Sequence, residues 1–443
     1  MTTTGCAMNQ HLVRKLAPRV IIVEEAAEVL EANLLACLHE ACEHLIMIGD
    51  HKQLRPSLNE YMLSRKDFDV SMFERLVKPM QATYLRQQHR MRPSICDLVR
   101  DVYDEAGGLV DDESVQTKED SFPLLRRDAA SVFFWSHTSP DERSKLGSSW
   151  QNVEEANRMV GLLRLVKETT SVEYDDFALL VPYSGQKWLV RDLLNEARIP
   201  LRSKQSPTSG VTLSTVDKFQ GDEAKFVILS LVRSNAEGKI GFLSKENRMT
   251  VALSRARRGL VILGDVDQLR RAKSSHWRRV IEQLERHKQL GAHLPIECPR
   301  HPVSTKDCAT ADDLVNLCTE VCGRPLSDHC EHKCPSKCHH HIDSRCSAPC
   351  GKKLACLHPC SGKCSSCHER GICDPCRKSV TVVSPCGVDK HTVKTICHKQ
   401  EVSPSMCTFP CQRTRLCNHP CQLLCGKVCE SGRCKLCLEN DKW

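Results

Sequence analysis

The 443-residue chain has no long apolar segment. None of its apolar runs reaches the roughly 18 residues that a membrane-spanning helix needs. Its N-terminus also lacks the basic segment followed by an apolar stretch that marks a secretory signal. These absences predict a soluble, intracellular protein with no membrane span.

Cysteine is scarce before residue 298, where only 4 of the 29 cysteines lie. The other 25 fall in residues 298–443, so the chain divides there by composition alone. A cysteine-dense tail is either a disulfide framework or a set of metal sites. Histidines alternate with these cysteines at one-residue gaps, and the rest of the chain is poor in cysteine, so the pattern favours metal.

No HExxH motif or similar arrangement occurs in the tail. Catalytic zinc needs an open coordination position and a nearby general base, whereas closely spaced Cys and His residues suit closed structural sites. Several structural zinc ions are therefore predicted, and their binding would contribute folding free energy that so little apolar sequence cannot supply.

The phosphate-binding motif GxxxxGK[ST] is also absent from the sequence. The net charge is +8, and residues 298–443 hold 21 Lys and Arg against 14 Asp and Glu, while the preceding residues hold 42 against 41. A basic tail suits an acidic partner such as nucleic acid, although zinc-bound thiolates would offset the surplus.

A carboxylate pair follows an apolar run in the stretch VIIVEEAAEV, residues 20–29. We expect a buried parallel strand at 20–23 that ends in Glu24 and Glu25, with a second strand at 44–49 and an amphipathic helix at 28–42 between them. Open α/β sheets bind ligands at this edge, and nucleoside triphosphatases place such an acid pair there.

A second α/β region follows, with β-rich apolar runs separated by helical patterns. The runs are residues 131–135, 177–181, 211–216, 226–232 and 259–264, and the helical patterns are 152–167, 184–197 and 274–291. Alternating strands and helices predict a doubly wound parallel sheet. Gly291 is expected to end the last helix, and Trp188 and Trp277 are expected in the core.

The tail repeats the spacing CxHxCxxxC at residues 330–338, 356–364 and 417–425. A cysteine pair precedes each copy, and the last two copies end in CDPC (373–376) and CKLC (434–437). Which cysteines share one ion cannot be read from the spacing. The predicted metal ligands are Cys318, Cys322, Cys330, His332, Cys334, Cys338, Cys346, Cys350, Cys356, His358, Cys360, Cys364, Cys367, His368, Cys373, Cys376, Cys407, Cys411, Cys417, His419, Cys421, Cys425, Cys429, Cys434 and Cys437.

Four further stretches carry a family resemblance: GDHKQLRP (49–56), RQQHRMRPSI (86–95), STVDKFQGDEAKFVIL (214–229) and MTVALSRARRGLVILG (249–264). With VEEAA they resemble, in the right order, the motifs of superfamily 1 helicases of the branch that acts on RNA in nonsense-mediated decay. This resemblance covers residues 1–270, and the tail resembles NFX-type zinc-finger repeats.

The resemblance implies an ATP site. Glu25 matches the acid that orients the hydrolytic water, and Glu24 stands where most relatives have a Mg²⁺-binding aspartate. Gln53 matches the γ-phosphate sensor, and Arg90 and Arg255 match two arginines that stabilise transition-state charge.

Other motif positions are implied to bind nucleotide or nucleic acid. The further nucleotide-binding positions are Asp50, Gln220, Gly221 and Glu223, and those near the nucleic-acid backbone are Pro182, Tyr183 and Gln186. The implied domains are the C-terminal part of a first RecA-like domain (1–78), a second RecA-like domain (79–290) and zinc-finger repeats (298–443).

The resemblance also implies ATP with Mg²⁺ and single-stranded RNA bound with little sequence preference. RNA surveillance, small-RNA silencing and antiviral response are the implied processes, with RNA-silencing or RNA-polymerase complexes as partners. Cytoplasm, nucleus or RNA granules are the implied compartments. The P-loop is expected upstream of residue 1, as for a C-terminal portion of a larger helicase.

Two other functions are open at this point. One is a zinc-dependent, nucleic-acid-binding scaffold that no longer hydrolyses ATP, which Glu24 and the missing P-loop favour. The other is a zinc-dependent ubiquitin ligase, since Cys/His-rich modules can recruit a conjugating enzyme, although the sequence has no clear cross-braced RING spacing.

Overall fold

The chain folds as two compact units, Met1–Glu320 and Val321–Trp443. The computed structural model describes residues 2–80, 82–116, 121–126, 131–145, 147, 149–203, 209–272, 274–321, 323, 325–327, 330–334, 336–338, 346–386, 391–399, 402–411, 414, 418–421 and 423–425. Among these residues, no helix is both long enough and apolar enough to cross a lipid bilayer.

The first unit contains a parallel sheet flanked by helices. Its α-helices are α1 Thr3–Met8, α2 Gln10–Leu16, α3 Glu31–Leu35, α4 Tyr61–Ser64, α5 Met72–Val77, α6 Pro93–Cys96, α7 Glu113–Gln116, α8 Val153–Thr169, α9 Ser184–Glu196, α10 Glu246–Leu253, α11 Val266–Arg271 and α12 Ser275–Arg286. Its strands are β1 Val20–Val23, β2 His44–Met47, β3 Gln87–Gln88, β4 Val110–Asp111, β5 Val132–Ser136, β6 Glu142–Arg143, β7 Trp150–Gln151, β8 Phe177–Val181, β9 Thr212–Thr215, β10 Ala224–Ser230, β11 Ala256–Gly264, β12 Leu290–Gly291, β13 Leu294–Glu297 and β14 Thr305–Cys308. Its 3-10 helices are η1 Ala26–Glu28, η2 Arg100–Ala106, η4 Tyr174–Asp176, η5 Val216–Lys218, η6 Gly241–Ser244 and η7 Ala311–Asp313.

The N-terminal strands β1 and β2 pair in parallel, from Val20 opposite His44 to Val23 opposite Met47. The helix predicted for 28–42 is wrong in length, because only Glu31–Leu35 is α-helical, after the 3-10 turn η1. Leu30 has an extended backbone with ψ 132°, and the imidazole of His39 accepts the N–H of Ala41. Both features are incompatible with one continuous helix.

The central sheet has six strands in the order β12-β5-β11-β10-β8-β9, and every neighbouring pair is parallel. Each of the five apolar runs predicted as strands lies in it. All five residues of β8 are buried, as expected for a strand covered on both faces. The predicted α/β fold with a doubly wound parallel sheet is confirmed.

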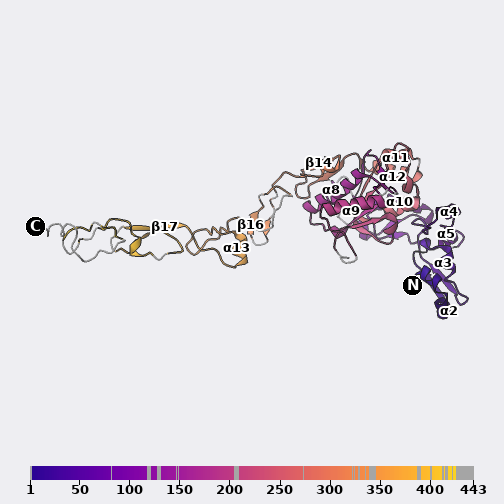
Figure 1. Ribbon diagram of the computed structural model, residues 1–443, viewed down its shortest axis with the longest axis horizontal. Helices are drawn as coiled ribbons and strands as arrows, with labels where there is room; N and C mark the ends of the chain where they lie inside the picture. The colour runs from indigo at the N-terminus through magenta and orange to yellow at the C-terminus, as the bar shows by residue number, and fades with distance from the viewer. Residues whose placement is uncertain are drawn as a thin grey trace. The chain divides into compact units, whose positions relative to one another are not determined.

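Helices α8 and α9 pack side by side against this sheet (Figure 1). Asn152 caps α8, because its side chain accepts the N–H of Glu155, and two acids in the first turn suit the positive end of the helix dipole. The apolar residues of α8 recur at helical spacing and are buried, so both predicted helices form where the periodicity places them.

The last helix ends earlier than predicted. α12 stops at Arg286, and Gly291 lies in the short edge strand β12, where Gly291 pairs with Trp135. Trp277 is buried and its indole N–H donates to Leu243 O, so its core position is confirmed. Trp188 is 45% exposed, so the expectation that it lies in the core is wrong.

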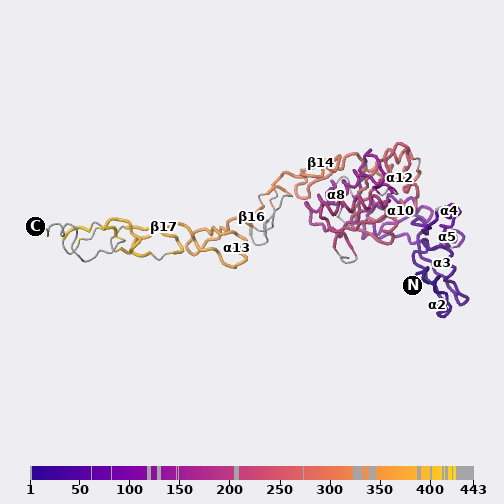
Figure 2. The backbone as a smooth tube through the Cα atoms, viewed as in Figure 1, coloured from indigo at the N-terminus to yellow at the C-terminus, as the bar shows by residue number. Residues whose placement is uncertain are grey.

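The second unit has little regular structure. Its elements are β15 Pro325–Ser327, β16 Cys330–Lys333, α13 Cys364–Glu369, β17 Ser379–Val383, β18 Thr392–Ile396 and η8 Pro404–Met406. The strands form antiparallel hairpins, and much of the remaining chain runs as paired loops (Figure 2). Among its described residues, Val393 is the one buried apolar side chain that is not cysteine, so cysteines make up the core.

Candidate nucleotide site and metal centres

The loops that follow β1 and β2 pack backbone against backbone. Ala26 N donates to Ile48 O over 2.8 Å, and a Cβ on Gly49 would lie 2.9 Å from Ala27 N. Glu25 has a left-handed backbone with φ 52°, a conformation that non-glycine residues adopt mainly in turns and at functional sites. The close approach of these loops fixes Glu25 at the C-terminal edge of the two strands.

Asp50 and Gln53 lie in a hydrogen-bonded chain that reaches Arg255. Asp50 Oδ2 accepts Gln53 Nε2 at 2.9 Å and Tyr103 OH at 2.7 Å. Gln53 Oε1 then accepts Arg255 Nη2 at 2.7 Å. Gln53 lies in the loop after β2 and is held from both sides. One of its two partners, Arg255, is a cation that lies 202 positions later in the sequence.

Arg255 is 1% exposed, and its guanidinium is anchored to the main chain. Nε donates to Val251 O at 3.1 Å and Nη1 to Asp222 O at 3.3 Å. Burial and, to a smaller extent, the positive charge of Arg90 together lower its pKa to about 10. Arg255 is therefore still a cation at neutral pH, and it is held in place before any ligand binds.

Arg90 forms an ion pair with Glu223, with Nε 2.6 Å from Oε2. Arg257 contacts the other oxygen of the same carboxylate at 3.1 Å. Burial opposes ionisation of Glu223, but the hydrogen bonds from Arg257 and Arg90 outweigh it and lower the pKa of this carboxyl group. Arg90 thus has an anionic partner within the protein.

Gln220 follows β9 and the turn η5, and its side chain points to the acid Glu25 at the end of β1. Its Nε2 lies 3.5 Å from Glu25 Oε2, and its Oε1 is buried with no hydrogen-bond partner among the described residues. Gly221 follows with φ 79°, a left-handed conformation that glycine adopts without strain. Glu24, which precedes Glu25, is exposed.

Glu28 is a further acid of the candidate site, and none of the sequence motifs singles it out. Burial and the charges of Glu25 and Asp217 raise its pKa to about 7, and Arg255 acts in the opposite direction. It ends the turn η1 directly after the acid pair. A third acid in VEEAAE was a visible signal, but its environment depends on segments that lie far away in the sequence.

The three residues predicted to lie near nucleic acid have different environments. Pro182 is buried, and Tyr183 OH accepts Phe242 N at 3.0 Å. Gln186 is 0% exposed: its Oε1 accepts Asn152 N and its Nε2 donates to Asn152 O. The structure gives Gln186 a positioning role, so no direct nucleic-acid contact is expected of its side chain.

Cys and His side chains of the second unit converge in groups whose ligand atoms lie within 4.8 Å of one another. The groups are Cys350, Cys360, Cys367 and Cys373; Cys356, His358, Cys376 and Cys397; Cys386, His391, Cys407 and Cys425; and His332, Cys346 and Cys364. Tetrahedral zinc with Zn–S bonds of about 2.3 Å holds two sulfurs roughly 3.8 Å apart. Cys350 and Cys373 are 3.8 Å apart, and Cys360 and Cys367 are 3.7 Å apart.

His332 carries a further sign of a metal site. Its Nδ1 is buried and has no hydrogen-bond partner among the described residues, although a buried ring nitrogen normally has one. A zinc ion held with Cys346 and Cys364 would satisfy that atom. The residues present therefore fit structural zinc in both number and chemistry.

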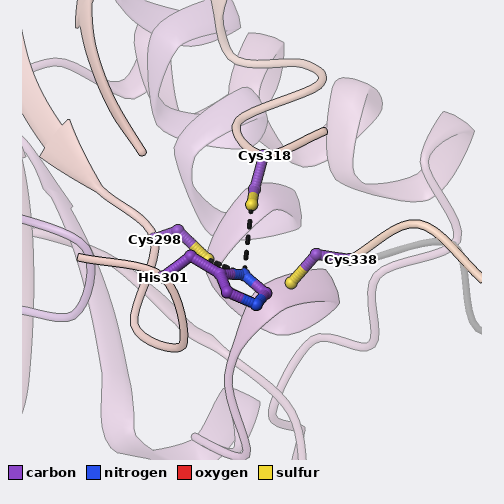
Figure 3. A group of neighbouring side chains, drawn as sticks. All are labelled: Cys298, His301, Cys318 and Cys338. Carbon is purple, nitrogen blue, oxygen red and sulfur yellow. Dashed lines mark hydrogen bonds between the residues drawn. The ribbon is translucent and has the colours of Figure 1, made fainter. Parts of the chain in front are cut away.

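The first unit brings three such ligands together (Figure 3). His301 Nδ1 lies 3.2 Å from Cys318 Sγ and 3.7 Å from Cys298 Sγ. Figure 3 also labels Cys338, which belongs to the second unit. In sequence, Cys338 has the position in its CxHxCxxxC phrase that Cys364 and Cys425 have in theirs.

The predicted ligands fall into three classes. Those found in the groups are Cys318, Cys338, His332, Cys346, Cys350, Cys356, His358, Cys360, Cys364, Cys367, Cys373, Cys376, Cys407 and Cys425. Those described but outside the groups are Cys334, His368, Cys411, His419 and Cys421, whereas Cys322, the side chain of Cys330, Cys417, Cys429, Cys434 and Cys437 lie outside what the structure describes. The groups also contain Cys298, His301, Cys386, His391 and Cys397, which lie outside the repeated phrases and were therefore missed.

Comparison with known proteins decides the family. Family models described as "AAA domain" match residues 1–59 and 68–267. The mouse NFX1-type zinc finger-containing protein 1 is 37% identical over 457 positions, covering 99% of this chain and 22% of the mouse protein. The chain is homologous to the NFX1-type zinc finger-containing proteins over nearly its whole length.

Other relatives share the helicase-like part of the chain. The Helicase required for RNAi-mediated heterochromatin assembly 1 of Schizosaccharomyces pombe is 35% identical, covering 67% of this chain and 29% of that protein. A Regulator of nonsense transcripts 1 homolog of Neurospora crassa is 31% identical, covering 62% of this chain and 25% of that protein. The chain thus spans less than a third of the length of each relative.

Proposed function

We propose that this chain forms part of an ATP-driven RNA helicase and that its Cys/His-rich region is built on structural zinc. The observation that carries the proposal is the hydrogen-bonded chain from Asp50 through Gln53 to the buried cation Arg255. Such a chain links the strand-end loop to a distant segment. A shift of this loop would change the hydrogen bond that Arg255 donates to Gln53, which is the kind of link that coupling of nucleotide state to movement requires.

The residues at the strand ends fit a nucleoside triphosphate with Mg²⁺. Glu25, held by its left-handed turn and within reach of Gln220, would orient the attacking water, and Glu24 would hold the metal through water. The bound nucleotide would supply the γ-phosphate, and the bound Mg²⁺ would neutralise part of its charge. Arg255 and Arg90 would stabilise developing negative charge, once Arg90 exchanges Glu223 for the phosphate.

RNA is the proposed nucleic acid, bound mainly through its phosphates. The names of the relatives point to RNA interference and nonsense transcripts, which supports a role in RNA silencing or surveillance. We further propose that residues 1–78 complete a first RecA-like domain and that residues 79–290 form the second. The basic tail, residues 298–443, would add zinc-dependent contacts to RNA or to partner complexes.

ATP hydrolysis tests the proposal. The 443-residue chain should show no RNA-stimulated hydrolysis above background, because it has no GxxxxGK[ST] motif. The same chain joined to its family's P-loop segment should hydrolyse ATP, and Glu25→Gln should reduce turnover at least about a thousandfold while ATP binding persists. Glu43→Gln, which changes an acid that pairs with Arg19 on the surface, is the matched control.

The second candidate is a nucleic-acid-binding scaffold without hydrolysis. The specific observation that favours it is Glu24, where the resembling helicases mostly have aspartate. If the joined protein binds RNA but hydrolyses no ATP, and Glu24→Asp does not restore turnover, the helicase proposal fails and the scaffold takes its place.

A further inference from the structure

The turn between β13 and β14 positions two zinc-type ligands beside a third. Cys298 follows β13, and its N–H donates to Ser304 O at 2.9 Å, while Ser304 N donates to His301 O at 2.7 Å. These bonds form a tight turn that places Cys298 and His301 on one side. Cys318 approaches the same imidazole from the chain that follows η7, at 3.2 Å from Nδ1.

The β13–β14 hairpin is part of the first unit and not a free linker. Ile296 pairs with Leu125 in an antiparallel bridge, and Glu297 N donates to Leu124 O at 2.8 Å. Arg126 N donates to Pro295 O at 3.1 Å. The hairpin is therefore fixed to the body of the first unit through main-chain hydrogen bonds.

The segment from 309 to 317 lies against α8. Arg158 of α8 donates from Nη2 to Ala309 O at 2.6 Å, and its guanidinium lies 4.2 Å from the centre of the Trp135 ring. Gly161 leaves room for Leu314: a Cβ at Gly161 would lie 3.0 Å from Leu314 Cδ1. Apart from the 3-10 turn η7, this segment has no regular secondary structure. Cys298 and His301 precede it, on the other side of β14, and Cys318 directly follows it.

We propose that Cys298, His301 and Cys318 hold a zinc ion that is a structural part of the first unit and that clamps residues 309–317 onto α8. Tetrahedral zinc keeps a cysteine sulfur and a histidine nitrogen roughly 3.5 Å apart, which agrees with the 3.2 and 3.7 Å separations. Both sulfurs are buried, and thiols are weak hydrogen-bonding groups, so a metal gives these side chains their strongest available bond. A fourth position is then open to a further thiolate or to water.

Cys308 provides an internal comparison. It lies at the end of β14, ten positions after Cys298, and it is equally buried. Its Sγ donates to Asp313 O at 3.6 Å, and it does not belong to the ligand group. Burial raises the pKa of this thiol to about 12, so it stays protonated. Cys308→Ser is therefore a matched control for Cys298→Ser.

The test uses the full chain, purified in reducing buffer. Zinc per chain, measured by elemental mass spectrometry, should fall by one equivalent in Cys298→Ser and stay unchanged in Cys308→Ser. Amide hydrogen exchange in residues 309–317 and in α8 should become at least about tenfold faster in Cys298→Ser, because loss of the clamp lets the segment open locally. Exchange in the sheet strand β8 should not change.

The proposal is overturned if Cys298→Ser keeps the full zinc content, or if exchange in α8 is unchanged. His301 gives a second test that does not depend on that variant's folding. His301→Cys should keep the wild-type zinc content, since cysteine is also a zinc ligand, whereas His301→Ala should lose one equivalent. Equal zinc content in these two variants would also overturn the proposal.

Discussion

Glu28 gives the candidate nucleotide site a dependence on pH. Burial, with the charges of Glu25 and Asp217, raises the pKa of its carboxyl group from 4.5 to about 7. The folded protein therefore holds this proton more tightly than the unfolded chain does. The contribution of this carboxyl group to the free energy of unfolding is fully present below pH 4.5, and it is lost as the pH rises towards about 7.

Replacement of Glu28 by glutamine should remove this loss. When the pH is raised from 5.5 to 8, the unfolding free energy of Glu28→Gln should increase relative to that of the wild type. The reason is that glutamine cannot ionise beside Glu25. Urea unfolding at the two pH values measures the difference, in which effects of zinc common to both proteins cancel. An equal difference at both values, or the same shift in the exposed-acid control Glu43→Gln, would contradict this explanation.

The sequence motifs predicted roles for Gln53 and Arg255 at one site, and in the structure Arg255 Nη2 lies 2.7 Å from Gln53 Oε1. Tyr103 and Glu28 were not identifiable in this way. The hydroxyl of Tyr103 reaches Asp50 across 53 positions, and the pKa of Glu28 depends on Asp217 and Arg255. Such environments arise only when distant segments meet, so motif letters cannot reveal them.

Among the elements, α8 depends most on one polar residue at its start. Asn152 is fully buried: its Oδ1 accepts Glu155 N, and its Nδ2 donates to Ser139 O and Val232 O. These bonds attach the beginning of the helix to the ends of two other segments. Asn152 therefore acts both as a helix cap and as a tie between elements.

Asn152→Ala should lower the unfolding free energy of the first unit by about 2 to 4 kcal/mol, because the cap is lost and two buried carbonyl groups lose their donor. Ser274→Ala is the control, since Ser274 caps α12 with one hydrogen bond, to Trp277 N, and should cost only about 1 kcal/mol. Denaturant unfolding followed by tryptophan fluorescence compares them. Equal losses would show that the ties to Ser139 and Val232 contribute nothing.

Periodicity was enough to place α8, α9 and the five strands, because the apolar residues of α8, β5, β8, β10 and β11 are mostly buried and those of β9 are half-buried. It failed for the segment 28–42, where the apolar side chain of Leu35 is 52% exposed and does not help to bury one face of a long helix. It also failed at Gly291, whose strand is only two residues long and depends on pairing with β5. Short elements set by tertiary contacts leave no periodic signal.

For the molecule as a whole, the two units depend on different forces. The first unit buries a large apolar cluster around its parallel sheet, whereas the described core of the second consists of cysteines and Val393. A strong zinc chelator should therefore remove the structure of residues 346–425 while β5, β8, β10 and β11 persist. Limited proteolysis before and after chelation, read by mass spectrometry, should show rapid cleavage only in the tail and in the neighbouring zinc-dependent segment before Glu320. An equally resistant tail after zinc removal would contradict this division.

Two of the cysteine groups interleave along the chain. Cys356 and His358 of one group lie between Cys350 and Cys360 of the other. The group that contains Cys356 and His358 is complete only at Cys397. During synthesis on a ribosome, the group that ends at Cys373 can therefore close while its neighbour still waits for 24 more residues. If zinc binds as each group emerges, the order of translation would restrict the partners of each thiolate, because one group would be filled before the last cysteine of the other leaves the exit tunnel.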